Sequence, residues 1–421
     1  MNILIPLSAG ALALAVTAYA EERPIAATSL FIERLVAEAV SKHPKVNAAK
    51  SRTQAASSAV NAIRLWEDPE IGLGITAASR IYREGNGDIA VGVSQRLPRR
   101  GLYEAQQRKA VAEQQAQRAE QSMTTNELGL AVAQATLELA LADEVLGLQT
   151  EELRWLDSLV TTARERAKNP DASAVESLRL ESEQALRTQK REAALRQRKQ
   201  YAGTLNLLLG REAQAHWPTL ALPQQADAGT SSALSLRARL EKQNPRLTSL
   251  RHQIAAAGAE ADAAREKRKP ALSVGVDTNT YSRGSFFDAM FSVKVTLPWF
   301  NSAAYKAEIA RAEQLRSAAR SDWEAASREL AAQLGTMLTD AENGEQLANA
   351  YRADVLPKTE KTVEAVQNAW VSSKATLLEV LESRRGLLES RQEHARAIAS
   401  QHAALAAITA LTGGFTTPDA K

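Results

Sequence analysis

The chain contains one pattern twice, at an offset of about 200 residues. Three pairs of positions carry it: His43-Pro44 with Asn244-Pro245, Leu97-Pro98 with Leu297-Pro298, and Leu209-Gly210 with the run from Leu411 to Gly414. Each copy is predicted to run helix, strand, strand, very long helix, helix. Few architectures need a duplicated unit of that order, so the repeat limits the fold more than any other feature.

Composition agrees with long helices and excludes several functions. The chain has 421 residues, enough for two to three domains, but the repeat favours one body built from two fused copies. Aromatic residues make up only 5%, which is typical of coiled coils. A net charge of +3 gives no indication of a nucleic-acid partner. The absence of cysteine excludes disulfides, thiolate metal sites and a lipid-anchoring cysteine.

Residues 1–20 have the pattern of an export signal. An apolar stretch from Ile3 to Val16 precedes Ala18-Tyr19-Ala20, an A-x-A cleavage site. The segment lacks the usual basic start, and the alternative is a membrane anchor, although the apolar run is short for a span. No later stretch approaches ~18 apolar residues. We therefore expect a mature protein in the periplasm, the outer membrane or the medium.

Four segments alternate between apolar and small or polar residues, as half-buried strands do. Their predicted bounds are 70–79, 88–97, 271–280 and 288–297. Each can reach the ~9–11 residues that cross a bilayer as a tilted strand. The alternative is two soluble hairpins packed on helices, because the signal for a membrane strand is weak.

Aromatic and basic residues bracket these segments and favour the membrane interpretation. The candidate membrane-interface aromatics are Trp66, Trp299 and Phe300 at one end and Tyr82 and Tyr281 at the other. Basic residues cluster where the chain enters or leaves the strands: Arg96, Arg99, Arg100, Arg265, Lys267, Arg268 and Lys269. They could contact lipid phosphates, and the alternative is that they are an ordinary solvent-exposed run of charges. Four strands cannot close a membrane barrel, so several chains would have to share one. Three chains would supply twelve strands.

The helices are unusually long. Their predicted ranges are 44–66, 101–167, 173–209, 246–268, 301–371 and 376–411, within a first repeat over 21–210 and a second over 233–415. A linker over 211–232 and a tail over 416–421 complete the chain. A helix of ~65 residues is roughly 100 Å long, too long for a compact domain. Pro357 should kink its helix or mark a boundary.

Two apolar seams run along the first long helix. Leu139, Leu146, Leu153 and Val160 form one; Leu141, Leu148 and Trp155 form another, about 200° round the helix. Seams on opposite sides suit a helix with a neighbour on each flank, as in a wall of helices. A helix inside an ordinary bundle is the alternative.

With these features, the sequence resembles the TolC family of trimeric outer-membrane channels. The resemblance rests on the helix starts His43-Pro44 and Asn244-Pro245 and on the strand ends Leu97-Pro98 and Leu297-Pro298. It also rests on Val355-Leu356-Pro357 and on the run from Lys374 to Glu382. Within the family it is most similar to the heavy-metal, CzcC-type branch, through Asp171-Ala172-Ser173 and Arg268-Lys269-Pro270.

The resemblance implies a mainly α fold with a small membrane β-barrel. Three chains would form a twelve-stranded barrel in the outer membrane of a Gram-negative bacterium and a twelve-helix α-barrel in the periplasm. The protein would be the passive exit duct of a tripartite efflux system. Its partners would be outer-membrane lipid, a periplasmic adaptor and an inner-membrane RND-type pump. Divalent metal cations are the cargo expected from the branch; drugs, organic solvents or type I secretion are alternatives. A soluble periplasmic coiled-coil adaptor is the alternative of another class.

The resemblance also implies candidate sites. Glu379 and Glu382 match the acidic constriction of the family, and three copies would place six carboxylates in one ring. Ordinary exposed helix glutamates are the alternative. Glu176 and Arg179 hold the matching positions of the first copy and could clamp a closed state. The candidate adaptor-contacting tip consists of Asp171, Ala172, Ser173, Ser373, Lys374, Ala375 and Thr376.

No pattern indicates an enzyme. The five histidines form no HExxH motif; His394 and His402 are eight residues apart on one helix, where a structural role is favoured over metal binding. Nucleotide-binding and GxSxG motifs are absent. Acidic pairs such as Glu151-Glu152 are expected on helix surfaces. We therefore predict no catalytic residues, no metal and no cofactor.

Overall fold

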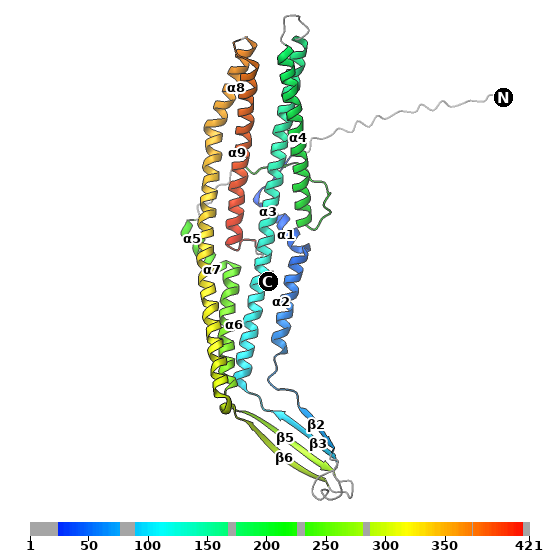
Figure 1. Ribbon diagram of the computed structural model, residues 1–421, viewed down its shortest axis with the longest axis vertical. Helices are drawn as coiled ribbons and strands as arrows, with labels where there is room; N and C mark the ends of the chain where they lie inside the picture. Colours follow the sequence, from blue (N-terminus) through cyan, green and yellow to red (C-terminus); the bar gives the residue numbers. More distant parts are fainter. Residues whose placement is uncertain are drawn as a thin grey trace, which may run out of the picture.

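The computed structural model describes residues 24–75, 89–166, 174–224, 232–280, 287–372 and 374–415. The molecule is a long rod of helices with a small sheet at one end (Figure 1). The first repeat consists of β1 (Ile25–Ala26), α1 (Ser29–Lys42), α2 (Pro44–Ala62), β2 (Glu70–Ile75), β3 (Ile89–Arg96), α3 (Arg100–Arg166) and α4 (Ala174–Leu208). The second consists of β4 (Leu220–Ala221), α5 (Ala233–Gln243), α6 (Pro245–Lys267), β5 (Ala271–Thr280), β6 (Phe287–Thr296), η2 (Pro298–Asn301), α7 (Ser302–Ala350), η3 (Tyr351–Val355), α8 (Leu356–Val371) and α9 (Leu377–Leu411).

The repeated helix starts have one local cause. The His43 side chain accepts a hydrogen bond from the backbone of Lys45, and Asn244 accepts one from Leu247, so each caps the helix that follows. Pro44 and Pro245 occupy the first helical position, where a missing N–H costs nothing. The short helices α1 and α5, which precede these caps, were not among the predicted elements.

The second long helix is interrupted, where the sequence predicts one helix over 301–371. A five-residue π turn, Tyr351–Val355, separates α7 from α8. The N–H of Leu356 bonds to the carbonyl of Tyr351, five residues back. Pro357 follows at the start of α8, where its missing N–H is tolerated. The proline therefore lies at a boundary, as predicted.

The four long strands form one antiparallel sheet in the order β2-β3-β5-β6. The two hairpins join through β3 and β5, with Val93 opposite Val276. One row across the sheet is apolar, namely Ile71, Val93, Val276 and Phe291. The next row is Glu70, Ser94, Gly275 and Ser292, and it points to the opposite face.

The helices form a wall one helix thick. Near the sheet, neighbours in space are α2, α3, α6 and α7, and at the far end they are α4, α3, α9 and α8 (Figure 1). The apolar contacts are divided among separate clusters along the rod. On α3, Leu139 and Val160 of the first predicted seam are buried, whereas Leu146, Leu153 and all of the second seam are partly exposed.

A polar clamp fixes the short strands to the middle of the rod. Arg198 on α4 pairs with Asp143 on α3, and Asp143 also accepts a hydrogen bond of 2.9 Å from the backbone of Leu220. The indole of Trp217 donates to Asn206 at 2.6 Å. The parallel pair of β1 and β4 was not predicted, because strands of two residues carry no periodic signal.

Candidate functional site

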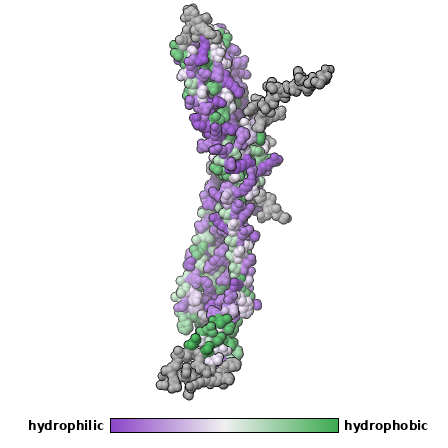
Figure 2. Space-filling model, turned by 90° about the vertical axis from the view of Figure 1, so that its right-hand side faces the viewer, coloured by the Kyte–Doolittle hydropathy of each residue, from purple (hydrophilic) through white to green (hydrophobic). Residues whose placement is uncertain are grey.

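One face of the sheet is apolar and exposed. Leu73, Ile75 and Phe291 are 78%, 84% and 81% exposed, respectively. Figure 2 shows hydrophobic surface gathered at this end of the molecule. Trp66, Trp299 and Phe300 are also exposed, on the segments that connect helices to the sheet. Tyr82 and Tyr281 lie outside the described residues. An apolar face of this extent requires a non-aqueous or protein neighbour.

Apart from Met290, the opposite face of the sheet carries small and polar residues. Asp277 lies across from Gly92, and a Cβ added at Gly92 would be 2.1 Å from a carboxylate oxygen of Asp277. Gly92 therefore leaves the space that this side chain occupies. Within the described residues β2 and β6 are each paired on one side only, so the sheet has two open edges. Open edges present unpaired N–H and C=O groups.

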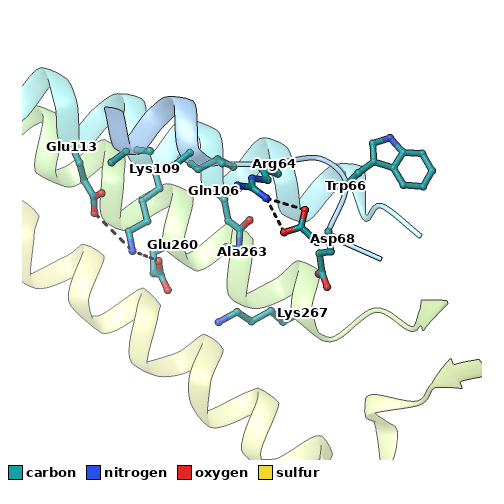
Figure 3. A pocket seen from close by; sticks show the side chains of 14 residues that line it. Arg64, Trp66, Asp68, Gln106, Lys109, Glu113, Glu260, Ala263 and Lys267 are labelled. Atoms are coloured by element: carbon teal, nitrogen blue, oxygen red, sulfur yellow. Dashed lines mark hydrogen bonds and ion pairs between the residues drawn. The ribbon is translucent and has the colours of Figure 1, made fainter. Parts of the chain in front are cut away.

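The helical wall has a hollow of about 890 Å³ beside the sheet, lined by residues of α2, α3 and α6 (Figure 3). Lys109 lies 2.7 Å from Glu260 and 3.8 Å from Glu113. The hydrogen bond to Glu260 raises the pKa of Lys109 and lowers that of Glu260, which keeps both groups charged. Trp66 points away from this cluster in Figure 3.

Most of the basic residues at the strand ends have acidic partners within the chain. Arg265 pairs with Glu313 at 2.8 Å and with Asp262 at 2.9 Å. Three further pairs are Arg96 with Glu67, Lys267 with Glu308, and Lys269 with Glu266. Contact of these cations with lipid phosphates would have to compete with those pairs.

At the start of α9, the candidate gate residue Glu379 takes part in capping the helix. Glu379 accepts a hydrogen bond of 2.7 Å from the backbone N–H of Thr376, and the Thr376 hydroxyl accepts one from the Glu379 N–H. This capping box satisfies two backbone donors and lowers the pKa of Glu379. Glu382, one turn later, is exposed and forms no ion pair within the described part of the chain.

The other candidate tip residues are only partly described. Glu176 and Arg179 are both exposed at the start of α4, and no ion pair joins them. The backbone N–H of Lys374 bonds to the carbonyl of Ala369 at 2.8 Å, which closes the turn after α8. Ala375 is partly buried next to the cap residue Thr376. Asp171, Ala172, Ser173 and Ser373 lie outside the described residues.

The prediction that Glu151 and Glu152 both lie on a helix surface is wrong for Glu152. Glu152 is only 5% exposed, and its carboxylate lies 3.0 Å from Arg384 on α9. Arg384 also lies over the ring of Trp155, at 4.8 Å from its centre. Burial raises the pKa of Glu152, against the lowering effect of Arg384 and Arg187. Leu148 and Leu156, four residues to either side, are the sequence signal that this acid faces a packed surface.

Further ion pairs extend this contact across all four helices at the far end of the rod. They are Arg391 with Glu151 and with Glu360, Arg385 with Glu183, and Arg187 with Glu183. The α3–α4 hairpin is thus joined to the α8–α9 hairpin by charges as well as by the apolar cluster around Leu156 and Leu381.

Two histidines of α9 are partly buried. The Nε2 of His402 has no hydrogen-bond partner among the described residues, and burial lowers the pKa of this side chain. Burial and nearby Arg352 also lower the pKa of His394. No cluster of three or more His, Cys, Asp or Glu side chains suited to a metal occurs in the regions the structure describes. Among the described helices, none is both long and apolar enough to cross a bilayer.

Comparison with known proteins identifies the fold. The sequence model of the family described as outer membrane efflux protein matches residues 236–414, which is the second repeat. The curated proteins contain no match to this sequence. The chain is similar to the outer membrane protein VceC of Vibrio cholerae, at 16% identity and a TM-score of 0.77, covering 92% of this chain and 97% of that one.

Two further solved channels have the same fold. The CmeC outer membrane channel of Campylobacter jejuni is 13% identical with a TM-score of 0.74, covering 100% of this chain and 96% of that one. The open MtrE outer membrane channel of Neisseria gonorrhoeae is 17% identical with a TM-score of 0.75, covering 91% and 89%. The predicted fold is therefore confirmed by the solved structures, and the family model covers the second half of the chain.

Proposed function

We propose that this chain is one third of a trimeric exit duct in the outer membrane, passively conducting substrate delivered by an inner-membrane RND-type pump through a periplasmic adaptor. The observation that carries the proposal is the sheet, with an exposed apolar face, a polar opposite face and two open edges. A bilayer tolerates such a sheet only if its edges are closed by other strands. Edge β2 of one copy would pair with edge β6 of the next, giving twelve strands.

The outermost helices support closure in the same way. Small exposed residues form a stripe on α2 and another on α7, and they permit close approach of two helix axes. On α2 these are Ala48, Ser51, Ala55, Ser58 and Ala62; on α7 they are Ala307, Ala310, Ser321, Ala325 and Ala332. With α2 of one copy against α7 of the next, three copies would close a twelve-helix tunnel.

Within this duct we assign different roles to the two candidate gate acids. Glu379 is held by the cap of α9, whereas Glu382 is exposed and unpaired among the described residues. Three copies of Glu382 at a constriction would repel one another and attract cations. Replacing Glu382 by alanine should raise conductance in planar bilayers and weaken block by divalent cations. Unchanged conductance and block would remove Glu382 from the gate.

The cargo follows only from the branch that the sequence resembles. Divalent metal cations are the first choice, with drugs, organic solvents or type I secretion as alternatives. A deletion strain plated against zinc, cobalt, cadmium, nickel, copper and a drug panel tests this assignment. Sensitivity to drugs with unchanged metal tolerance would reverse it.

Extraction tests the duct itself. Outer membranes should yield a trimer that resists mild detergent and dissociates on heating. A monomer found free in the periplasm would contradict the proposal and favour the soluble adaptor alternative.

A further inference from the structure

One row of the sheet carries a single charge on its polar face. The register places Gly72, Gly92, Asp277 and Met290 side by side across the four strands. The two glycines have no side chain, so only Asp277 and Met290 rise from this row. Met290 is 58% exposed, and Asp277 is partly exposed. The candidate gate acids lie at the opposite end of the rod (Figure 1).

The carboxylate of Asp277 lies over the bare backbone of Gly92. A Cβ added at Gly92 would overlap one carboxylate oxygen, so this glycine is what gives the acidic side chain its place. Within the described residues, Asp277 forms neither a hydrogen bond nor an ion pair. A carboxylate with no cation beside it keeps its full charge for interaction with mobile ions.

The basic residues of the same face lie farther toward the helices. Arg96 and Lys294 share a row with Ser273, which is four residues along β5 from Asp277, or roughly 13 Å. That separation exceeds the screening length of ~10 Å at 0.1 M salt. Arg96 also pairs with Glu67 at 3.0 Å. Two more acids lie on this face among the described residues, Glu70 and Asp288. The charge of Asp277 is therefore not cancelled by these bases.

The position of Asp277 in the duct rests on the proposed function. With the apolar face of the sheet toward lipid, the polar face lines the lumen of the barrel. Twelve tilted strands give a backbone radius of roughly 12 Å, so a side chain as short as aspartate stands roughly 9 Å from the axis. The row would then form a ring in which each copy contributes one carboxylate, two glycines and Met290.

We infer that Asp277 gives the barrel a preference for cations over anions. Three carboxylates roughly 9 Å from the axis should raise the cation concentration there roughly threefold at 0.1 M salt and lower that of anions by the same factor. At ~1 M salt the screening length is ~3 Å, and the preference should nearly vanish. The carboxylates would be roughly 15 Å apart, too far for one ion to touch two of them. The ions attracted are therefore hydrated cations, without direct coordination.

The absence of cysteine allows the position of Asp277 to be tested directly. In trimers reconstituted into lipid vesicles, Asp277→Cys should react with charged methanethiosulfonates that do not enter lipid. Val276→Cys, on the apolar face, should stay unreacted. Equal reaction at the two positions, or faster reaction at Val276→Cys, would overturn the inference.

Ion selectivity in planar bilayers tests the charge. In a KCl gradient around 0.1 M, Asp277→Asn should lower the potassium-to-chloride permeability ratio by roughly threefold, and near 1 M it should match the parent. The matched variant Asp277→Asn/Met290→Asp returns one carboxylate per chain to the same row and should restore the ratio. Failure to restore it would mean that the charge of the row is not the cause, and would overturn the inference.

Two further comparisons separate this inference from the proposed function. Each variant is also made together with Glu382→Ala, so that selectivity at the candidate gate cannot mask that of the barrel. A conducting trimer whose permeability ratio at 0.1 M is unchanged by Asp277→Asn in both backgrounds would overturn the inference and leave the duct intact. A chain that forms no trimer and no conductance would overturn the proposed function, and the inference with it.

Discussion

Replacing Arg384 by alanine should loosen the joint between the two hairpins at the far end of the rod. Glu152 would remain buried without its nearest cation, 3.0 Å away in the parent. Breaking a buried ion pair from one side costs about 3–5 kcal/mol. Because the buried Arg187 also lowers the pKa of Glu152, we expect the lower value, ~3 kcal/mol.

Hydrogen exchange measures this effect locally. A loss of ~3 kcal/mol corresponds to roughly a hundredfold loss of amide protection in α9 around Arg384 and in α3 around Glu152. The control is Arg396→Ala on the same helix, which removes an exposed pair with Glu393 and should change protection by about twofold or less.

The stability lost in Arg384→Ala, called the deficit below, should depend on pH through the pKa of Glu152. Burial already raises that pKa above its ordinary value, and loss of Arg384 raises it further. Such a carboxyl contributes most favourably to folding below its unfolded pKa, and this contribution is lost as the pH rises through the folded pKa. The deficit of Arg384→Ala should therefore be largest at about pH 8 and shrink towards about pH 5. Parent-like exchange at the higher pH, or a deficit that grows on acidification, would refute the reasoning.

Three further predictions concern other parts of the molecule. Val276→Arg places a charge on the apolar sheet face and should cost about 2–4 kcal/mol of folding into lipid vesicles, measured by urea titration, whereas Ser292→Arg on the opposite face should cost much less. Gly344→Ala should destabilise α7 against α9 by about 1–3 kcal/mol in thermal unfolding, because the added Cβ would lie 2.9 Å from the Gln401 backbone nitrogen. Gly335→Ala meets nothing within 4 Å and should be neutral or stabilising, so equal effects of the two would contradict the packing argument. Trp217→Phe should cost about 1–3 kcal/mol by leaving the buried Asn206 carbonyl without its donor, and a melting temperature equal to that of the parent would contradict this.

Features with a local cause were predictable from the sequence. Pro44 and Pro245 begin helices because a capping side chain precedes each of them, and the strands alternate because one face is apolar. The motif Thr376-x-x-Glu379 is also local, and it indicates a capping box. Resemblance to a family instead assigned Glu379 to a gate, although the local pattern already gave that residue a structural role.

Features that depend on distant residues were not predictable. Arg384 and Glu152 are 232 positions apart, and only the packing of α9 on α3 brings them together. The pairing of β1 with β4 likewise joins Ile25 to Leu220. The hollow between α6 and α7 also depends on how these two helices lie side by side, since the arginines that line it are dispersed among ordinary helix charges in the sequence.

The π turn between α7 and α8 determines which side of α8 faces α9, compared with an unbroken α-helix. Gly344 packs on α9 before the turn, and Val363 is buried after it. Nineteen residues separate these positions, so an unbroken α-helix would point them ~100° apart. One extra residue taken up by the π turn removes one step of ~100°, and the two positions then face the same way. Deleting a single residue from Tyr351–Val355 would therefore give a regular helix that still presents both positions to α9, because the remaining eighteen residues make five complete turns.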